Sequence, residues 1–300
     1  TNISGRITDV AVTSPRGDTY TLYVAGASSG VWKSINEGVS WECVFDEAPS
    51  MSIGDVTLDP SNQETVWVGT GEANIFRSSM AGAGVYRSLD GGATWEHRGL
   101  AETHTIARIV VHPADSDTVY VAASGNEWTP NPERGVYRTR DGGENWVPLK
   151  SGLPTIAVRD IAIQERENDL VLGTFGRGFY VLDNYSPLRE LEYVLDQEAA
   201  FFTTKPGLLF RRANIGGTDY KGAQLYKAKN PEVGTTFEWY LAENAKRVKE
   251  NRPEANNELP HYPSLDQLQA EDWEEKPYLL FEISDSLGNP VARFTKSDSK

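Results

Sequence analysis

The stretch GVYRSLDGGATW (Gly84–Trp95) decides the fold of this chain, because its pattern recurs. It returns as GVYRTRDGGENW (Gly135–Trp146) and, in a weaker form, as GVWKSINEGVSW (Gly30–Trp41). The octapeptides that end these segments begin at residues 34, 88 and 139, at spacings of 54 and 51 residues. Self-similarity at such a period is typical of solenoids, propellers and other arrays.

The segments before each octapeptide also align, and they have the pattern of β-strands. TLYVAGAS, TVWVGTGE and TVYVAASG begin at residues 21, 65 and 118, after ITDVAV, IGDVTLDP and ARIVVHP. Apolar residues alternate along them, and turn residues separate them. Each unit therefore predicts four short strands, which is the composition of a β-propeller blade with its first strand beside a central channel. The predicted fold class is all-β.

A fourth unit lacks the octapeptide. VRDIAIQ, DLVLGTFG and GFYVLDN match the first three strands, and PLRELEYV, from Pro187, is a candidate for the outer one. Four units are at the low end of what closes a propeller. The sequence leaves open whether these units form a small closed ring or part of a larger one.

The pattern changes after about residue 196, so we expect propeller blades in residues 1–195 and a β-sandwich-like domain in residues 196–300. Only about four or five strands are predicted there, so this domain can be incomplete. Gly288 and Asn289 mark a hairpin turn. The charged segment 244–276 predicts a helical insertion, in which Ser264 and Gln267 form a capping box.

Composition narrows the classes of partner. The formal charge of -14 repels phosphate backbones, so we expect no nucleic-acid partner. No apolar run reaches the roughly 18 residues of a membrane span. The single cysteine, Cys43, excludes an internal disulfide and a cysteine-based zinc site, and the four histidines lack metal-ligand spacing, so we expect no metal or cofactor. The chain begins at Thr1 with no visible signal peptide, and we expect a secreted, periplasmic or cell-surface protein.

The octapeptide S/T-x-D-x-G-x-T-W resembles the Asp-box of bacterial neuraminidase (BNR) repeats. Together with GRITDVAV, SIGDVTLDP and GTFGRGFYVLDNYSPLREL, it makes roughly residues 1 to 195 similar to secreted bacterial Asp-box propellers of the sortilin-like and photosystem II assembly-factor-like kinds. The C-terminal third resembles the fibronectin-like tail of such proteins. The resemblance implies that the octapeptide is not catalytic. Family members are usually longer, with more blades before the closing one, whereas TRDGGENW here runs straight into it.

The physical chemistry of the octapeptide also favours a structural turn. An aspartate can accept hydrogen bonds from turn amides, and glycines supply positive φ. In the first repeat Asn36 replaces the aspartate and Glu37 replaces a glycine, changes that a turn survives and a carboxylate site does not. The residues assigned to this structural role are Asn36, Trp41, Asp90, Gly92, Trp95, Asp141, Gly143 and Trp146.

Two expanded loops between the second and third strands are the candidate ligand site. They are GEANIFRSSMAGAG, from Gly71, and SGNEWTPNPERG, from Ser124, and they share one face of the propeller with the connections between blades. Their mixture of carboxylates, amides, guanidinium groups and an indole suits recognition of a sugar or a peptide. The alternative is that these residues brace the loops. The candidate residues are Glu72, Asn74, Arg77, Asn126, Glu127, Trp128 and Arg134.

A second candidate site lies on the inner strands. Alignment places Asp9, Asp55, Arg108 and Asp160 at equivalent positions. The three carboxylates are candidate catalytic residues of a glycosidase, or ligands of a cation. The alternative is a ring of charges in which Arg108 neutralises its neighbours.

Two functions remain open. We favour a non-catalytic binding module with a protein or glycan ligand on the loop face; the oligomeric state is not predicted. The alternative is a glycoside hydrolase of the sialidase-like or xyloglucanase-like Asp-box type. Against it, Arg6, Arg108 and Arg159 occupy different strand registers and predict no convergent sialidase triad. The R-T-D-x-G-G start of xyloglucanase-like propellers is replaced here by GRITDVAV.

Overall fold

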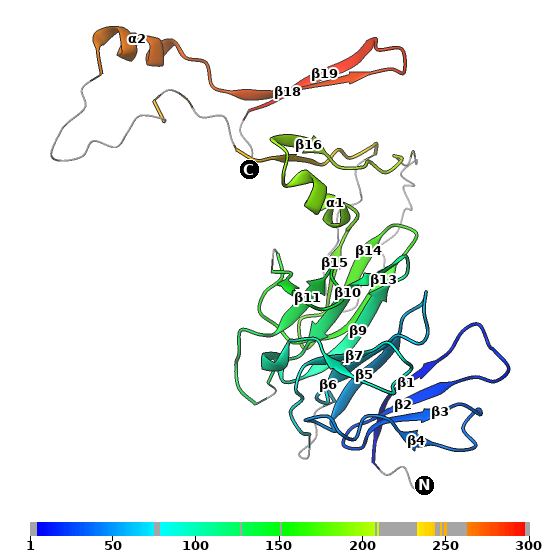
Figure 1. Cartoon of the computed structure of the whole chain (residues 1–300). Coiled ribbons are helices and arrows are strands. Elements are labelled where there is room, and N and C mark those ends of the chain that lie inside the picture. Colours follow the sequence, from blue (N-terminus) through cyan, green and yellow to red (C-terminus); the bar gives the residue numbers. More distant parts are fainter. Residues whose placement is uncertain are drawn as a thin grey trace, which may run out of the picture. The chain divides into compact units, whose positions relative to one another are not determined.

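The computed structural model describes residues 5–74, 79–126, 128–150, 152–207, 209, 233–243, 247, 249–250 and 263–297 (Figure 1). The chain divides into two compact units, residues 1–185 and residues 186–300, and each is described by itself.

The first unit contains four antiparallel sheets, in which successive strands are neighbours. The first sheet consists of β1 (Ile7–Val12), β2 (Leu22–Gly26), β3 (Gly30–Ser34) and β4 (Glu42–Cys43). The second consists of β5 (Ile53–Leu58), β6 (Val66–Thr70), β7 (Val85–Ser88) and β8 (Glu96–His97). The third consists of β9 (Ile106–His112), β10 (Asp115–Ala123), β11 (Gly135–Thr139) and β12 (Val147–Pro148), after a short 3-10 helix, Ala101–Thr103. The fourth has three strands, β13 (Val158–Gln164), β14 (Asp169–Thr174) and β15 (Phe179–Leu182).

These sheets are β-propeller blades, as the repeats predict. Their first strands pack side by side in the order β1, β5, β9 and β13 (Figure 1). Apolar residues of alternating strand positions fill the space between consecutive blades, where burial stabilises the stack. Between the first and second blades the buried side chains include Tyr23, Val31 and Val56. Between the second and third they include Trp67 and Ile109.

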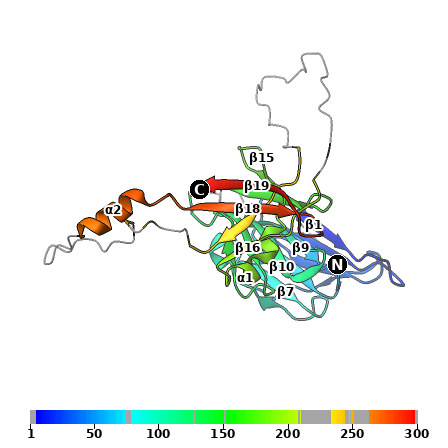
Figure 2. The same ribbon diagram turned by 90° about the horizontal axis from the view of Figure 1, so that it is seen from above.

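The second unit contains α1 (Pro187–Val194), β16 (Ala199–Phe201), β17 (Trp239–Leu241), α2 (Leu265–Trp273), β18 (Tyr278–Ser284) and β19 (Pro290–Ser297). β16 pairs with β17. β18 forms a hairpin with β19, which Figures 1 and 2 both show. The ring of Phe281 joins the two pairs, with centroids 4.9 Å from Trp239 and 6.0 Å from Phe201. The fibronectin-like sandwich stays a prediction.

The predicted capping box is present. Ser264 Oγ accepts a hydrogen bond from Gln267 N at 3.3 Å, and Gln267 Oε1 accepts one from Ser264 N at 2.8 Å. The helix that it starts, α2, occupies only nine residues of the predicted insertion 244–276, and most of the remainder lies outside the described residues. Neither described helix has the length and apolar character that crossing a membrane requires.

The prediction that PLRELEYV is the outer strand of the fourth blade is wrong, because this segment forms α1 and belongs to the second unit. Pro187 begins the helix, where its missing N–H costs nothing and its fixed φ suits helical backbone. Leu188, Leu191 and Val194 follow at helical spacing, and Val194 is buried. The fourth blade therefore has no outer strand among the residues that the structure describes.

Candidate functional site

The octapeptides form turns built on one side chain. Asp90 Oδ1 accepts hydrogen bonds from Ser88 Oγ at 2.7 Å and Thr94 N at 2.8 Å, and its Oδ2 accepts one from Thr94 Oγ1 at 2.6 Å. These bonds, those from Thr94 first, lower the pKa of Asp90 to about 2. Asp141 makes the corresponding bonds with Thr139 and Asn145. Each carboxylate is thus engaged in closing its own turn.

The first octapeptide keeps this turn without a carboxylate. Asn36 Oδ1 accepts a hydrogen bond from Ser40 N at 2.9 Å, while Asn36 Nδ2 donates to Ser40 Oγ at 2.9 Å. Glu37 adopts a φ of 60°, close to the 66° of Gly91 in the second turn. The amide oxygen accepts the same backbone hydrogen bond, and the amide nitrogen donates to the Ser40 hydroxyl instead of accepting from it, so the turn forms without a negative charge.

The octapeptide tryptophans join neighbouring blades. Trp95 Nε1 donates to Val44 O of the first blade at 2.6 Å, and Trp146 Nε1 donates to Arg98 O of the second at 2.6 Å. In the opposite direction, Lys33 Nζ donates to the carbonyl of Gly91 at 2.7 Å. The octapeptides therefore contribute hydrogen bonds between blades.

The inner-strand charges form one cluster around Arg108. Its Nη1 lies 3.0 Å from Asp55 Oδ1 and 3.6 Å from Asp9 Oδ2, and its Nε lies 3.7 Å from Asp160 Oδ1. Partial burial alone would lower the pKa of Arg108, but the three carboxylates outweigh it and raise that pKa. The strand register shifts directly before each aspartate, and such bulges redirect side chains. The four residues that the alignment predicts to be equivalent therefore lie close together in space.

Asp55 is the buried member of this cluster. Its Oδ2 accepts hydrogen bonds from Ile109 N at 2.9 Å and Thr57 Oγ1 at 2.8 Å, in addition to the ion pair with Arg108. Burial raises its pKa to about 7, against the opposing effect of Arg108. In the same way, Asp9 Oδ2 accepts a hydrogen bond from Val56 N at 3.2 Å. Both carboxylates therefore bind the backbone of the following blade, an arrangement that holds blades together.

The first expanded loop is braced at Glu72. This side chain is buried, pairs with Arg6, and accepts a hydrogen bond from Ser79 Oγ at 3.2 Å. Its backbone N–H donates to Ser52 Oγ at 3.1 Å. Asn74 contributes its backbone carbonyl, which accepts hydrogen bonds from Arg6 and Ser79. The contacts of Glu72 favour bracing over ligand binding, while the predicted site residue Arg77 lies outside the described residues.

The second expanded loop presents Trp128. Arg134 donates to the backbone carbonyls of Asn126 and Thr129, and Asn131 Nδ2 donates to Asn126 O at 3.3 Å. Asn126 Oδ1 accepts a hydrogen bond from Trp128 N at 3.0 Å. Trp128 is 70% exposed. Asn126 and Arg134 thus fix the backbone around an exposed indole, while Glu127 lies outside the described residues.

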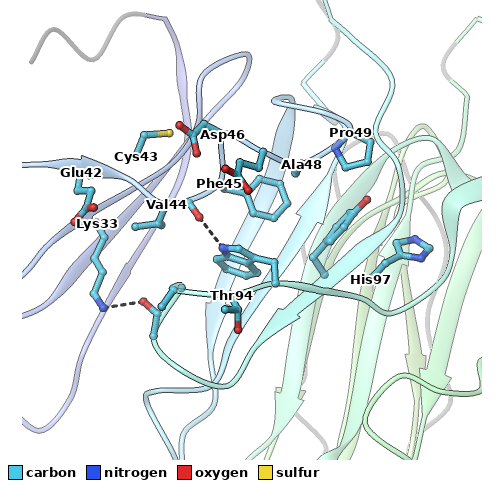
Figure 3. Close-up of a pocket in the computed structure, with 16 residues that line it drawn as sticks. Lys33, Glu42, Cys43, Val44, Phe45, Asp46, Ala48, Pro49, Thr94 and His97 are labelled. Carbon is cyan, nitrogen blue, oxygen red and sulfur yellow. Dashed lines mark hydrogen bonds between the residues drawn. The ribbon is translucent and has the colours of Figure 1, made fainter.

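A groove lies between the first two blades, and the sequence does not predict it. It has a volume of about 850 Å³ and lies beside the outer strands β4 and β8 (Figure 3). Phe45 and Trp95 line it with ring centroids 4.9 Å apart. Cys43 also lines it, and burial raises the pKa of its thiol, which disfavours the nucleophilic thiolate at neutral pH. No signal in the repeat pattern marks this groove, because it arises where two blades meet.

The fold therefore places this chain in the class of β-propeller proteins, with propeller blades in residues 1–185 and a second compact unit in residues 186–300. The chain matches no protein-family model and no curated protein sequence. Similar solved structures include an ancestral GH74 enzyme, with 20% sequence identity and a TM-score of 0.46 over 59% of this chain and 22% of that one. The GH74 xyloglucanase from Xanthomonas campestris has 19% identity and a TM-score of 0.44, over 61% of this chain and 29% of its own. YCF48 bound to D1 peptide has 13% identity and a TM-score of 0.42, over 60% and 52%. At these identities the similarity concerns the fold, and the chain spans between 22% and 52% of these proteins' lengths.

Proposed function

We propose that residues 1–185 form a non-catalytic binding module whose protein or glycan ligand contacts the loop face at Trp128. The observation that carries this proposal is an exposed indole on a loop whose backbone is fixed by Arg134 and Asn131. An indole on such a fixed backbone offers a large apolar surface, and only its few side-chain torsions remain to be ordered when a ligand binds. Such a surface stacks on sugar rings or packs against apolar side chains.

The electrostatics of the carboxylate cluster support binding over hydrolysis. A glycosidase needs two carboxyl groups that reach the scissile bond, one as acid and the other as nucleophile or base. The raised pKa of Asp55 suits a general acid, and this is the observation that favours the alternative, a glycoside hydrolase. However, the Asp55 side chain is 2% exposed and already binds Arg108, Thr57 and Ile109. A substrate would have to displace these partners to reach it.

The test uses two tryptophans of the same chain. The wild type is screened against a peptide library and a glycan array that includes xyloglucan oligosaccharides, and each bound probe is then measured with two variants. Trp128→Ala is expected to weaken binding about tenfold or more. Trp273→Ala is the matched control, because Trp273 is also exposed, at 84%, but belongs to α2 of the second unit.

The same screen tests the alternative. Release of reducing sugar from xyloglucan, abolished by Asp55→Asn, would establish the hydrolase and overturn the proposal. Equal affinity of wild type and Trp128→Ala for every bound probe would overturn the assignment of the loop face.

A further inference from the structure

The groove between the first two blades has an aromatic wall. Trp95, Phe45, Tyr86 and His97 line it in a chain of ring contacts, with successive centroids 4.9, 5.3 and 5.0 Å apart. Its volume of about 850 Å³ lies within the range of ligand pockets. Aromatic rings of this kind pack against alkyl groups and attract cations through their faces.

One polar side chain of this wall is buried without a partner. Tyr86 is 7% exposed, and its hydroxyl forms no hydrogen bond with any residue that the structure describes. The equivalent residue of the third blade, Tyr137, donates its hydroxyl proton to Glu133 O at 2.9 Å. Because buried polar groups are normally paired, the Tyr86 hydroxyl indicates a ligand in the groove that it lines. Its oxygen can accept a hydrogen bond from a cation.

The groove also carries negative charge. Glu42, Asp46 and Glu47 line it, and none of them forms an ion pair within the described part of the chain (Figure 3). Lys33 lines it as well, but its Nζ already donates to Gly91 O at 2.7 Å. The carboxylates therefore lack a cationic partner, and a cationic ligand complements them.

The propeller repeat does not require these features. Val44 and Arg98 are equivalent, because each accepts a hydrogen bond from the octapeptide tryptophan of the following blade. The next three residues are Phe45, Asp46 and Glu47 in the first blade, and Gly99, Leu100 and Ala101 in the second. The junction of the second and third blades thus keeps the tryptophan contact without this aromatic ring or these carboxylates. Joining two blades does not explain them.

We propose that this groove binds an extended basic segment of a partner protein, with a lysine or arginine side chain in the groove. The alkyl stem of that side chain packs on Phe45 and Trp95. Its cationic end meets the Tyr86 oxygen and the carboxylates of Asp46 and Glu47. The partner is a peptide segment because β4 and β8 are the last strands of their sheets, and such edges pair with extended backbone. The site is separate from the loop face at Trp128 and does not depend on the function proposed for it.

Fluorescence anisotropy of the full chain with a labelled peptide of alternating lysine and valine tests this site. The wild type is expected to bind this peptide and not the same peptide with glutamate in place of lysine. The double variant Asp46→Asn, Glu47→Gln should raise the dissociation constant about tenfold or more. Tyr86→Phe should raise it about threefold or more without lowering the melting temperature, because it removes a hydroxyl that has no partner among the described residues.

The double variant Asp18→Asn, Glu165→Gln is the matched control, because it changes the net charge equally at exposed positions outside the groove. This control and Trp128→Ala should each leave the affinity within about twofold of wild type. An equal loss in the control would indicate unspecific attraction to an acidic chain, and a loss in Trp128→Ala would assign the peptide to the loop face; either overturns the proposal.

Two further outcomes would also overturn it. One is a full chain that does not bind the lysine peptide, which is the result expected if another part of the chain fills the groove. The other is free lysine that binds as tightly as the peptide, which would assign the groove to small amines.

Discussion

Replacement of Arg108 by leucine should destabilise the first unit in a pH-dependent way. Arg108 is the cation that faces three carboxylates, and Asp55 beneath it is buried. Removing one partner of a fully buried ion pair costs about 3–5 kcal/mol. Because Arg108 is 41% exposed and solvent screens its charge, we expect the lower end, about 3 kcal/mol, above pH 7.

The pH dependence follows from Asp55. Its folded-state pKa is raised from 3.8 to about 7, so its contribution to stability is fully present below the unfolded value and is lost as pH rises through 7. Without Arg108 the folded pKa rises further. The free-energy difference between wild type and Arg108→Leu should therefore be small below pH 7 and grow by about 1.4 kcal/mol for each pH unit above it.

Urea unfolding followed by circular dichroism, below and above pH 7, measures this difference. In the Arg108→Leu background, Asp55→Asn should restore part of the stability, because it removes the uncompensated buried charge. Additive effects of the two substitutions, or a difference that does not change with pH, would refute the ion-pair account of the cluster.

Three further predictions concern the octapeptide turns. Asp90→Asn should lower the melting temperature less than Asp90→Ala in a thermal scan, because Asn36 closes the corresponding turn with an amide, whereas alanine offers no side-chain oxygen. Trp146→Phe removes the hydrogen bond to Arg98 O and should cost about 1 kcal/mol in urea unfolding; an unchanged midpoint would argue against this bond between blades. Slight burial alone would raise the pKa of Asp141, but hydrogen bonds from Asn145 and Thr139 lower it to about 2. The Asp141 carboxylate therefore stabilises the fold fully above pH 3.8, and this stabilisation is lost as the pH falls toward 2. An NMR titration of the Asp141 carboxyl group with a midpoint near pH 4 would contradict this prediction.

The repeats predicted most of the first unit, because strand alternation and turn chemistry are local properties of the sequence. IGDVTLDP became β5 (Ile53–Leu58), and alignment alone placed Asp55 and Arg108 at equivalent positions that meet in space. The prediction for PLRELEYV was wrong because eight residues of mixed polarity fit both the two-residue period of a strand and the 3.6-residue period of a helix. Pro187 at the first position favours the helix.

Contacts between residues far apart in the chain explain the features that the sequence did not predict. Glu72 looked like a loop residue available to a ligand, but it is buried against Arg6, 66 positions earlier in the chain. The groove beside Trp95 likewise depends on how two blades meet. Neither contact has a local signature, so both required the folded structure.

The most direct test of the functional account compares Trp128→Ala with Asp55→Asn on the same ligand, found by the peptide and glycan screen. Isothermal titration calorimetry measures both affinities against wild type. We predict that Trp128→Ala weakens binding about tenfold or more while Asp55→Asn leaves the affinity unchanged, because the proposed module binds its ligand at the indole, whereas the Asp55 carboxylate is buried and binds groups of its own and the following blade. The reverse result, with Asp55→Asn abolishing binding or turnover and Trp128→Ala without effect, would contradict the account.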